Sequence, residues 1–198
     1  MAKAIARALT IGHSNHPLDL FLGLLRDQRV QIVADTRSQP YSKYAPHYDQ
    51  EAIKAALDAN GIQYRFFGRE LGGRPSGADF YDAGGHVLYD RVAASSLFLE
   101  GLARLEQDLR KFRVALLCSE ENPAGCHRRL LIGRVLGEHD FDIQHIRGNG
   151  RLQPEADLVR EETGDDNQLS LFDHDAIPEW KSIPSVLPKK RQSNSSPG

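Results

Sequence analysis

Two cysteines, a histidine and an arginine stand close together in this 198-residue chain. Cys118 ends a short apolar run, and Cys126 and His127 follow at the start of a predicted helix. A helix N-terminus offers unpaired N–H groups and a positive dipole end, which bind anions and lower the pKa of a thiol. Arg128 adds a planar donor group suited to phosphate or carboxylate. We therefore predict an anion-binding site in which Cys118 or Cys126 is a reactive thiol paired with His127. The alternative is two small buried cysteines that close a tight loop.

Charged residues suited to acid–base chemistry follow the same apolar runs. Asp35 and Arg37 come directly after a second run, and Glu120 follows Cys118 by two positions. We predict that Asp35 or Glu120 acts as the general acid or base. Arg37 and Arg128 are predicted to hold an anionic substrate. The alternative for the neighbouring pair is a structural ion pair between Asp35 and Arg37.

Small polar and aromatic residues complete the predicted site. His13 and Ser14 follow the first apolar run, and we assign both to substrate binding. We assign Tyr44 to the same group, because an exposed tyrosine can stack on a nucleic-acid base. The same ring chemistry is available at Tyr41, Tyr48 and Tyr81. The alternative is that these tyrosines only cover the surface of the domain.

A zinc site is a second possibility at the same residues. Cys118, Cys126 and His127, with His13, are zinc ligands in kind. The chain has no Cys-x-x-Cys pair, and the adjacent Cys126 and His127 are expected to point apart on a helix. The spacing therefore argues against zinc, and we predict neither a metal nor another cofactor.

Apolar runs alternate with helical patterns along the chain. Predicted strands cover residues 7–11, 31–35, 62–67, 113–118 and 141–146, and predicted helices cover 17–28, 48–60, 91–110 and 128–138. This alternation predicts a three-layer α/β domain, with a mostly parallel sheet of about five strands between helices. Ligands bind outside the carboxyl ends of such strands, so the polar residues after each strand are expected to gather at one edge.

Several separated motifs carry a family resemblance. They are Thr10-Ile-Gly-His-Ser14, Asp35-Thr-Arg37 with Pro40, Gly61-Ile-Gln-Tyr64, Leu71-Gly-Gly73, Leu117-Cys-Ser-Glu120 and Cys126-His-Arg128. In this order, over residues 9–147, the chain resembles a bacterial conserved-hypothetical family, domain of unknown function 488 (DUF488). The resemblance implies that these positions form the family's presumed site. It supplies no reaction, so the chemistry rests on the residues themselves.

The composition changes near residue 155. Residues 1–150 hold 19 Lys and Arg against 18 Asp and Glu, whereas residues 151–198 hold 6 against 9. The second part contains scattered prolines and a Ser/Asn/Pro/Gly end, and it has no hydrophobic period. We predict a domain over 1–154 and a mostly disordered acidic tail over 155–198.

A short apolar motif interrupts the polar tail. Its residues are Gln168, Leu169, Ser170, Leu171 and Phe172. The motif resembles the peptide by which bacterial polymerases and repair proteins dock on the DNA sliding clamp, the polymerase beta subunit. Apolar side chains in a flexible segment are free to fill a partner's pocket. The alternative is that the segment folds back onto the domain through the same side chains.

Composition excludes several classes of protein. The longest apolar run, residues 114–118, is too short to cross a bilayer. The first residues carry no secretory pattern, and two cysteines are too few for a disulfide scaffold. We therefore predict a cytoplasmic protein without membrane association. A net charge of −2 argues against coating nucleic acid by bulk charge, but not against a local basic site.

Together these patterns predict an enzyme that acts on nucleic acid or a nucleotide during DNA repair or replication. The reaction class is hydrolysis or group transfer, and the tail is expected to recruit the protein to the clamp. Two alternatives remain open: a non-enzymatic adaptor that binds a nucleotide or phosphate, and a small-molecule enzyme unrelated to DNA.

Overall fold

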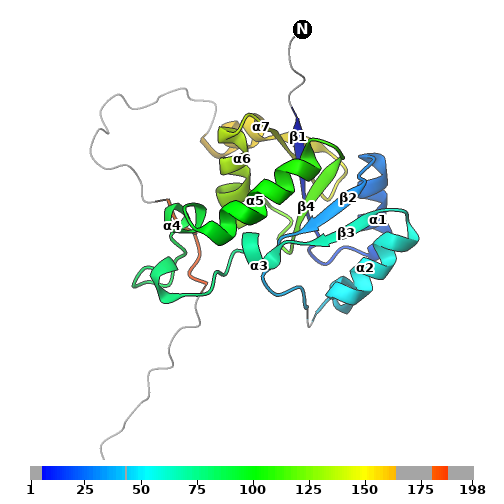
Figure 1. The fold of residues 1–198 in the computed structure, drawn as a ribbon. Helices are drawn as coiled ribbons and strands as arrows, with labels where there is room; N and C mark the ends of the chain where they lie inside the picture. The colour runs from blue at the N-terminus through cyan, green and yellow to red at the C-terminus, as the bar shows by residue number, and fades with distance from the viewer. Residues whose placement is uncertain (1–5, 43, 164–179, 187–198) are drawn as a thin grey trace, which may run out of the picture.

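A six-stranded sheet runs through the centre of the molecule (Figure 1). The computed structural model describes residues 6–42, 44–163 and 180–186. The strands are β1 (Arg7–Gly12), β2 (Ile32–Asp35), β3 (Gln63–Phe66), β4 (Val114–Cys118), β5 (Asp142–Ile146) and β6 (Leu152–Pro154). Their order is β3-β2-β4-β1-β5-β6, in which the first five strands are parallel and β6 is antiparallel to β5. The prediction of a mostly parallel sheet is confirmed, and β6 is an addition.

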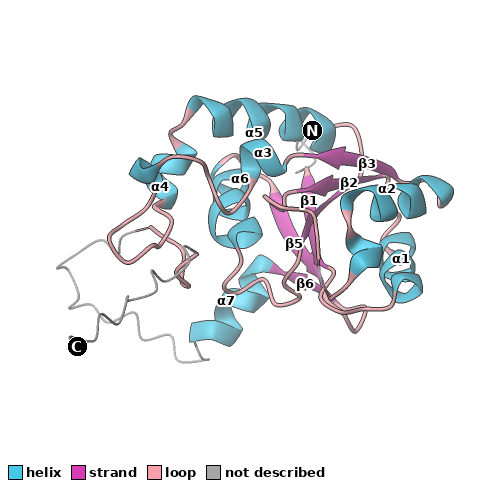
Figure 2. Ribbon diagram, turned by 90° about the horizontal axis from the view of Figure 1, so that it is seen from below, coloured by secondary structure: helices cyan, strands magenta, loops and turns pink. Residues whose placement is uncertain are grey.

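Helices cover both faces of the sheet, which confirms the three-layer α/β fold. The α-helices are α1 (Leu18–Asp27), α2 (Gln50–Ala59), α3 (Gly68–Leu71), α4 (Tyr89–Ala93), α5 (Ser96–Leu109), α6 (Arg134–Glu138) and α7 (Glu155–Thr163). Two 3₁₀ turns, η1 (Pro46–Tyr48) and η2 (Ala78–Phe80), and a π-helix, η3 (Arg128–Gly133), complete the elements of the described residues. Helices α1 and α2 lie on one face, and α3, α5 and α6 lie on the other (Figure 2).

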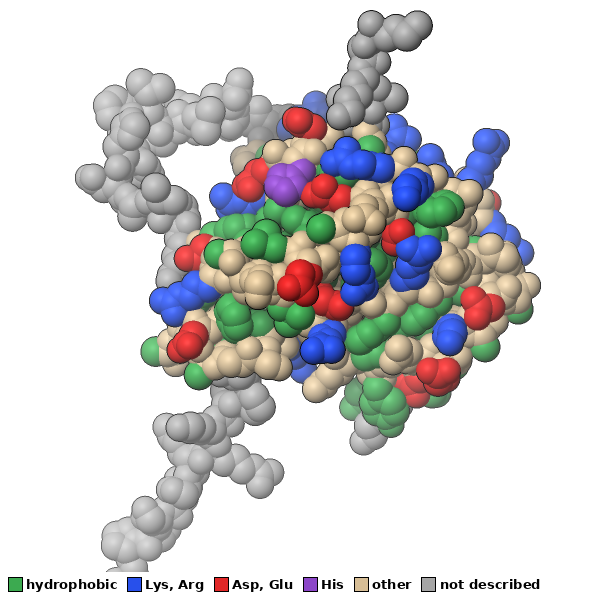
Figure 3. Space-filling model, viewed as in Figure 1, with side chains coloured by type: hydrophobic (Ala, Val, Ile, Leu, Met, Phe, Trp, Pro, Cys, Tyr) green, Lys and Arg blue, Asp and Glu red, His purple; other side chains and the backbone are tan. Residues whose placement is uncertain are grey.

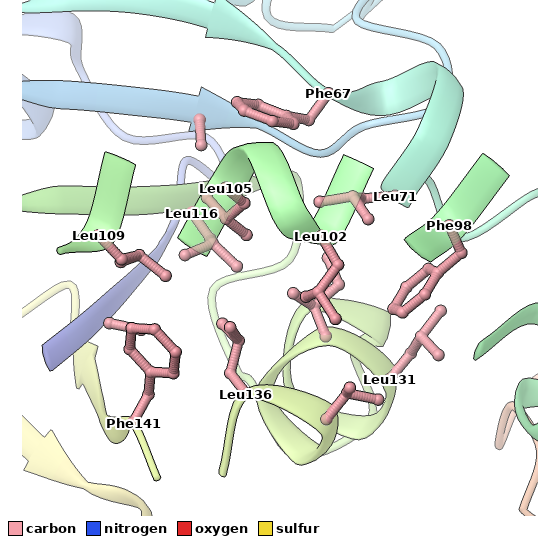
Figure 4. Packing of buried hydrophobic residues seen from close by; sticks show 14 of the residues in the cluster. Phe67, Leu71, Phe98, Leu102, Leu105, Leu109, Leu116, Leu131, Leu136 and Phe141 are labelled. Carbon is pink, nitrogen blue, oxygen red and sulfur yellow. The ribbon is translucent and has the colours of Figure 1, made fainter. Parts of the chain in front are cut away.

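Successive side chains of each central strand enter opposite apolar layers. Leu116 of β4 belongs to the layer beneath α5 and α6, together with Leu105 and Leu136 (Figure 4). The next residue, Leu117, belongs to the opposite layer with Phe21 of α1. Strands buried on both faces read as continuous apolar runs, and this explains why β4 is uniformly apolar.

The helix predicted over residues 91–110 is two helices. Helix α4 ends at Ala93, and α5 begins at Ser96. Between them, the Ser95 hydroxyl accepts a hydrogen bond from the Phe98 N–H at 3.3 Å. This N-cap satisfies one of the unpaired donors at the start of α5. The single long helix was therefore a wrong prediction, because the Ser95-Ser96 pair starts a new helix inside the periodic pattern.

Parts of the predicted tail pack against the domain. Residues 155–163 form α7, and the Trp180 indole N–H donates to the Leu130 carbonyl at 2.7 Å. Ser182 N–H donates to the Val87 carbonyl at 2.9 Å. The expectation of a mostly disordered segment is therefore wrong for residues 155–163 and 180–186, while the boundary at 154 stays a prediction. The clamp-like motif at 168–172 lies outside the described residues.

Acidic and basic side chains are interspersed on the face drawn in Figure 3. That face presents no broad basic surface, in line with the nearly balanced charge of the chain. None of the helices in the described ranges is long and apolar enough to cross a membrane.

Candidate active site

Three strands deliver their last residues to the same edge of the sheet. In the register, Gly12 of β1 stands opposite Cys118 of β4, and Asp35 of β2 stands opposite Leu117. The loops that follow these strands therefore meet above the carboxyl ends, where open parallel sheets bind ligands.

Two sulfurs and an imidazole nitrogen converge at this edge. Cys118 ends β4, and Cys126 and His127 precede η3. The two Sγ atoms are 3.2 Å apart, and His127 Nδ1 lies 3.7 Å from Cys118 Sγ and 3.9 Å from Cys126 Sγ. The expectation that Cys126 and His127 point apart is wrong. The chain before the π-helix turns both side chains toward Cys118.

The orientation of the His127 ring is fixed from its far side. Its Nε2 lies 3.0 Å from the Thr36 carbonyl oxygen, a contact that requires a proton on Nε2. Gly73 supports the same ring, because a Cβ built at that position would lie 2.7 Å from His127 Cγ. A glycine is therefore needed where the backbone approaches the imidazole closely. The result is that Nδ1 faces the sulfurs.

A buried arginine holds the loop that carries the two cysteines. Arg128 is 1% exposed and donates to the carbonyl oxygens of Glu120 and Glu121, the second at 2.7 Å. It also donates to Thr10 Oγ1 and to Cys126 Sγ, both at 3.3 Å. These four contacts tie residues 120–126 to β1 and to η3.

Glycine at position 12 completes the packing of this loop against β1. A Cβ at Gly12 would lie 1.7 Å from the Glu120 carbonyl oxygen, so any side chain would displace the loop. The backbone N–H groups of His13 and Ser14 donate to the carbonyls of Cys118 and Ser119, at 3.0 and 2.8 Å. The backbone of the Gly12-His13-Ser14 segment thus holds the loop that follows β4.

The environment shifts the pKa values of the two thiols in opposite directions. The Cys126 thiol donates to Cys118, and this contact, with His127 and Arg128 nearby, holds the pKa of Cys118 well below its usual value despite burial. The same contact and burial raise the pKa of Cys126 well above its usual value. Burial opposes a charge on His127, but the Cys118 sulfur outweighs it and raises the pKa of the imidazole. The arrangement favours a Cys118 thiolate beside a Cys126 thiol.

A cleft of about 440 Å³ opens over Cys118 and His127. Glu120 is exposed on its wall, and so is Arg74, which forms no ion pair with any residue that the structure describes. The other residues that line the cleft are Arg37, Ser38, Gln39, Tyr41, Gly73, Tyr89, Ser119, Gly125, Ser182, Pro184, Ser185 and Val186. The cleft therefore joins a buried sulfur to an exposed carboxylate and an exposed guanidinium.

The predicted pair Asp35 and Arg37 is a buried ion pair. Arg37 Nε and Nη2 donate to the two carboxylate oxygens of Asp35, at 2.9 and 2.6 Å. The Tyr64 hydroxyl donates to the same carboxylate at 2.8 Å, and Arg37 Nη1 donates to the Tyr48 carbonyl, also at 2.8 Å. Asp35 is fully buried. These contacts match the structural alternative for the pair more closely than a role as general base and substrate clamp.

His13 belongs to this buried network. Its ring stacks on Tyr48 with centroids 4.2 Å apart, and its two nitrogens contact the Ser14 carbonyl and Arg37 Nη1, at 2.7 and 3.2 Å. Burial lowers the pKa of His13 to about 4, so the ring is neutral at pH 7. A neutral, stacked imidazole orients Arg37 more readily than it binds an anion.

The predicted base-stacking tyrosines differ sharply in exposure. Tyr44 is 86% exposed and Tyr41 is 73% exposed, but only Tyr41 lines the cleft. Tyr48 is fully buried and has no ring face to offer a base. Of the tyrosines considered from sequence, Tyr41 is the one in position to contact a ligand in the cleft.

A family model described as "Domain of unknown function DUF488" matches residues 17–135. The chain belongs to the DUF488 family. The match includes the two cysteines, His127 and the arginine that holds their loop, so these residues lie within the family domain. Comparisons with curated proteins and with solved structures gave no match.

Sequence reasoning missed part of the cleft of this DUF488 protein. Arg74 was not assigned a role, although it stands in the glycine-rich stretch Gly72-Gly-Arg-Pro-Ser-Gly77. An arginine held between glycines near a predicted site was the available signal. Tyr89 and residues 182–186 also line the cleft. Their place depends on pairing between Leu88 and Lys181, which are far apart in the sequence, so no local pattern indicates it.

Proposed function

We propose that this DUF488 protein is a thiol-dependent enzyme, a hydrolase or transferase, that acts on a nucleotide or nucleic acid. One observation carries the proposal: Cys118 and His127 line the cleft, Cys118 Sγ lies 3.7 Å from His127 Nδ1, and the Thr36 carbonyl orients the imidazole. A nucleophile, a base within reach and a third group that orients the base form the usual arrangement for covalent catalysis.

The groups of the cleft suit a two-step reaction. The Cys118 thiolate attacks an electrophilic atom of the substrate, and the bond from that atom to the leaving group breaks. His127 gives a proton to the leaving group. Water, or a second substrate in a transferase, then cleaves the thioester-like or thiophosphate-like intermediate and returns the thiolate. In this proposal Glu120, which is exposed on the cleft wall, accepts the proton of the attacking water, and the transfer of that proton to His127 restores the starting state.

The walls of the cleft favour a substrate that carries both an anionic group and a flat ring. The Arg74 guanidinium matches phosphate oxygens in geometry and charge. The exposed ring of Tyr41 offers a stacking surface for a base. Nucleotides combine both features, which supports the nucleotide or nucleic-acid class over an uncharged metabolite.

The experiment measures thiol reactivity first. At pH 7, one cysteine is expected to react with iodoacetamide about 10-fold or more faster than a free thiol, and Cys118→Ser is expected to abolish this fast reaction. Product release from nucleoside triphosphates and single-stranded DNA is then compared in the native protein, Cys118→Ser and Arg74→Met. Full activity in Cys118→Ser would refute thiol catalysis. Slow labelling with tight nucleotide binding would favour the non-enzymatic adaptor.

Recruitment to the sliding clamp is a separate proposal. It rests on the sequence Gln168-Leu-Ser-Leu-Phe172, which lies outside the described residues. Binding of the full chain to a purified bacterial clamp is measured beside the variant Leu171→Ala/Phe172→Ala. Binding that the double variant loses would support action at replicating or repaired DNA. Absence of binding by the native chain would remove this part of the proposal and leave the enzyme proposal intact.

A further inference from the structure

We propose that Cys118, Cys126 and His127 form a zinc site of two sulfurs and one nitrogen, with a fourth coordination position open to the cleft. The three ligand atoms lie within 4.8 Å of one another. The inference deepens the proposed function, because a metal at this site determines whether the Cys118 sulfur is a nucleophile or a ligand. It rests on four observations of geometry and charge.

The triangle of ligand atoms has the size of a zinc site. Its sides are 3.2, 3.7 and 3.9 Å. The nearest point equidistant from three atoms at these separations lies in their plane, about 2.1 Å from each, and equidistant points above the plane lie farther away. A metal displaced from the plane toward the cleft, as tetrahedral coordination requires, therefore reaches the usual Zn–N distance of about 2.0–2.1 Å and Zn–S distance of about 2.3 Å after a small outward movement of the sulfurs.

The His127 ring has the proton arrangement of a metal ligand. Its Nε2 proton is directed at the Thr36 carbonyl oxygen at 3.0 Å, so the Nδ1 lone pair can face the sulfurs. Metal-binding histidines commonly donate their second ring N–H to a backbone carbonyl, which fixes the tautomer and the orientation. The close approach of Gly73 holds the ring in this position.

The charges around the triangle also suit a divalent cation. Two thiolates neutralise Zn²⁺, so the metal together with its three ligands carries no net charge. Arg128 Nη1 lies 3.3 Å from Cys126 Sγ and can donate to that sulfur in the thiolate form.

The position of the cleft makes this an open site. Cys118 and His127 line the cleft, whereas Cys126 is 2% exposed and lies behind them. Three protein ligands with a fourth position for water or substrate are typical of catalytic zinc, while structural zinc takes four protein ligands. Glu120, exposed on the same wall, is placed to assist a metal-bound water.

Direct metal binding tests the inference. The full chain is stripped with a chelator under reducing conditions and titrated with Zn²⁺ against a chromogenic chelator, and we expect one zinc per chain. Cys118→Ser, Cys126→Ser and His127→Gln are each expected to weaken binding by roughly 100-fold or more. Glu120→Gln, next to the site, is the matched control and is expected to keep the affinity. Absence of stoichiometric zinc, or unchanged affinity in all three ligand variants, would overturn the proposal.

Two further readouts do not depend on folding of the variants or on activity. Co²⁺ added to the native chain is expected to give the intense visible bands of tetrahedral cobalt with sulfur ligands. Zn²⁺ is expected to protect both cysteines of the native chain from iodoacetamide. Octahedral cobalt spectra together with unprotected thiols would refute the site.

The outcomes also separate this inference from the proposed function. Tight zinc binding with activity only in the loaded protein supports the site and removes Cys118 as the nucleophile. Tight zinc binding with activity only in the stripped protein supports both proposals, with the metal as an inhibitor. A chain that binds no zinc but has a fast-reacting Cys118 overturns the inference and leaves the proposed function standing.

Discussion

Replacing Arg128 by methionine distinguishes a structural role of this residue from a role in substrate binding. The sequence assigns the guanidinium to an anionic substrate, whereas the structure directs it at the chain itself. Methionine keeps much of the apolar stem and removes the donor group. The variant therefore tests the hydrogen bonds of Arg128 with little change in packed volume.

The contacts of Arg128 set the expected magnitude. Its removal leaves the carbonyls of Glu120 and Glu121 and the Thr10 hydroxyl without this donor. A buried polar group that loses its partner costs about 1–3 kcal/mol. Water can reach the carbonyls in the partly exposed loop, so we expect a loss of about 3–5 kcal/mol of unfolding free energy. Native domains have about 5–15 kcal/mol in total, so the variant is expected to be weakly stable.

Urea unfolding of the Arg128→Met variant, with Arg74→Met as control, measures this loss. Arg74 is exposed at the cleft and has no ion-pair partner in the part of the chain that the structure describes, so its replacement should change stability by about 0.5 kcal/mol or less. Nucleotide affinity should fall in Arg74→Met, the variant whose stability changes least. An Arg128→Met protein as stable as the native one, but unable to bind nucleotide, would refute this assignment.

Three further predictions concern the pH response, the imidazole and the chain boundary. Because burial lowers the pKa of His13 from 6.5 to about 4, the unfolded chain takes up a proton that the folded protein excludes as the pH falls between these values. The unfolding free energy should therefore drop by about 3 kcal/mol from pH 7 to pH 4 in urea titrations because of His13. The His13→Gln variant should lack this contribution to the pH dependence. Gly73→Ala should displace the ring of His127 and slow the alkylation of Cys118 by roughly 10-fold at pH 7, because a Cβ would lie 2.7 Å from that ring. A chain ended at Pro154 should lose about 2 kcal/mol in urea unfolding, because the α7 carboxylates of Glu155 and Glu162 pair with the buried Arg129, and Glu155 also accepts from His145 Nε2.

Matched variants accompany these experiments. Gly23→Ala, in α1 with open space around its Cβ position, should stabilise the protein and leave alkylation unchanged. A chain ended at Thr163 keeps α7 and is the control for the shorter chain. The reasoning fails if the His13→Gln protein keeps the full pH dependence, if Gly73→Ala labels normally, or if the two shortened chains unfold alike.

The sheet was predictable because its signal is local. A strand buried on both faces must be apolar throughout, so residues 114–118 indicate β4 without further context. Helix α7 gave no such signal, because its stability depends on charge pairing rather than on an apolar stripe. Glu155 accepts from His145 Nε2 and Arg129 Nε, both at 2.8 Å, and these partners are distant in sequence. From sequence alone, an acidic segment of this kind is predicted to be exposed to solvent, because the positions of its basic partners are not known.

Which residues lie at the candidate site was easier to predict from the sequence than what each of them does there. Asp35, Arg37 and Arg128 do gather at the expected edge, because strand ends are fixed by the apolar runs. Their roles depend on which groups lie within 3 Å, and only the fold determines that. Arg37, just after the buried end of β2, donates to the Asp35 carboxylate and the Tyr48 carbonyl, and Arg128 donates to the Glu121 carbonyl. The exposed Arg74, in contrast, lies in a glycine-rich stretch without hydrophobic periodicity, so no strand or helix is predicted there to position it.

The polar residues at this edge therefore divide into a support and a reactive centre. One buried chain of contacts runs from Arg128 through Thr10 and His145 to Glu155, with Thr10 Oγ1 2.8 Å from His145 Nδ1. A second chain joins Asp35 and Arg37 to the loop after β2. Arg37 lines the cleft and Arg128 holds the loop from Glu120 to Cys126, so the charge-assisted contacts of both chains support the residues around the cleft. Chemistry that depends on sub-ångström placement of a thiol and an imidazole needs such a rigid base. The contacts of the two buried arginines, Arg37 and Arg128, are therefore those of a support for the thiol and the imidazole.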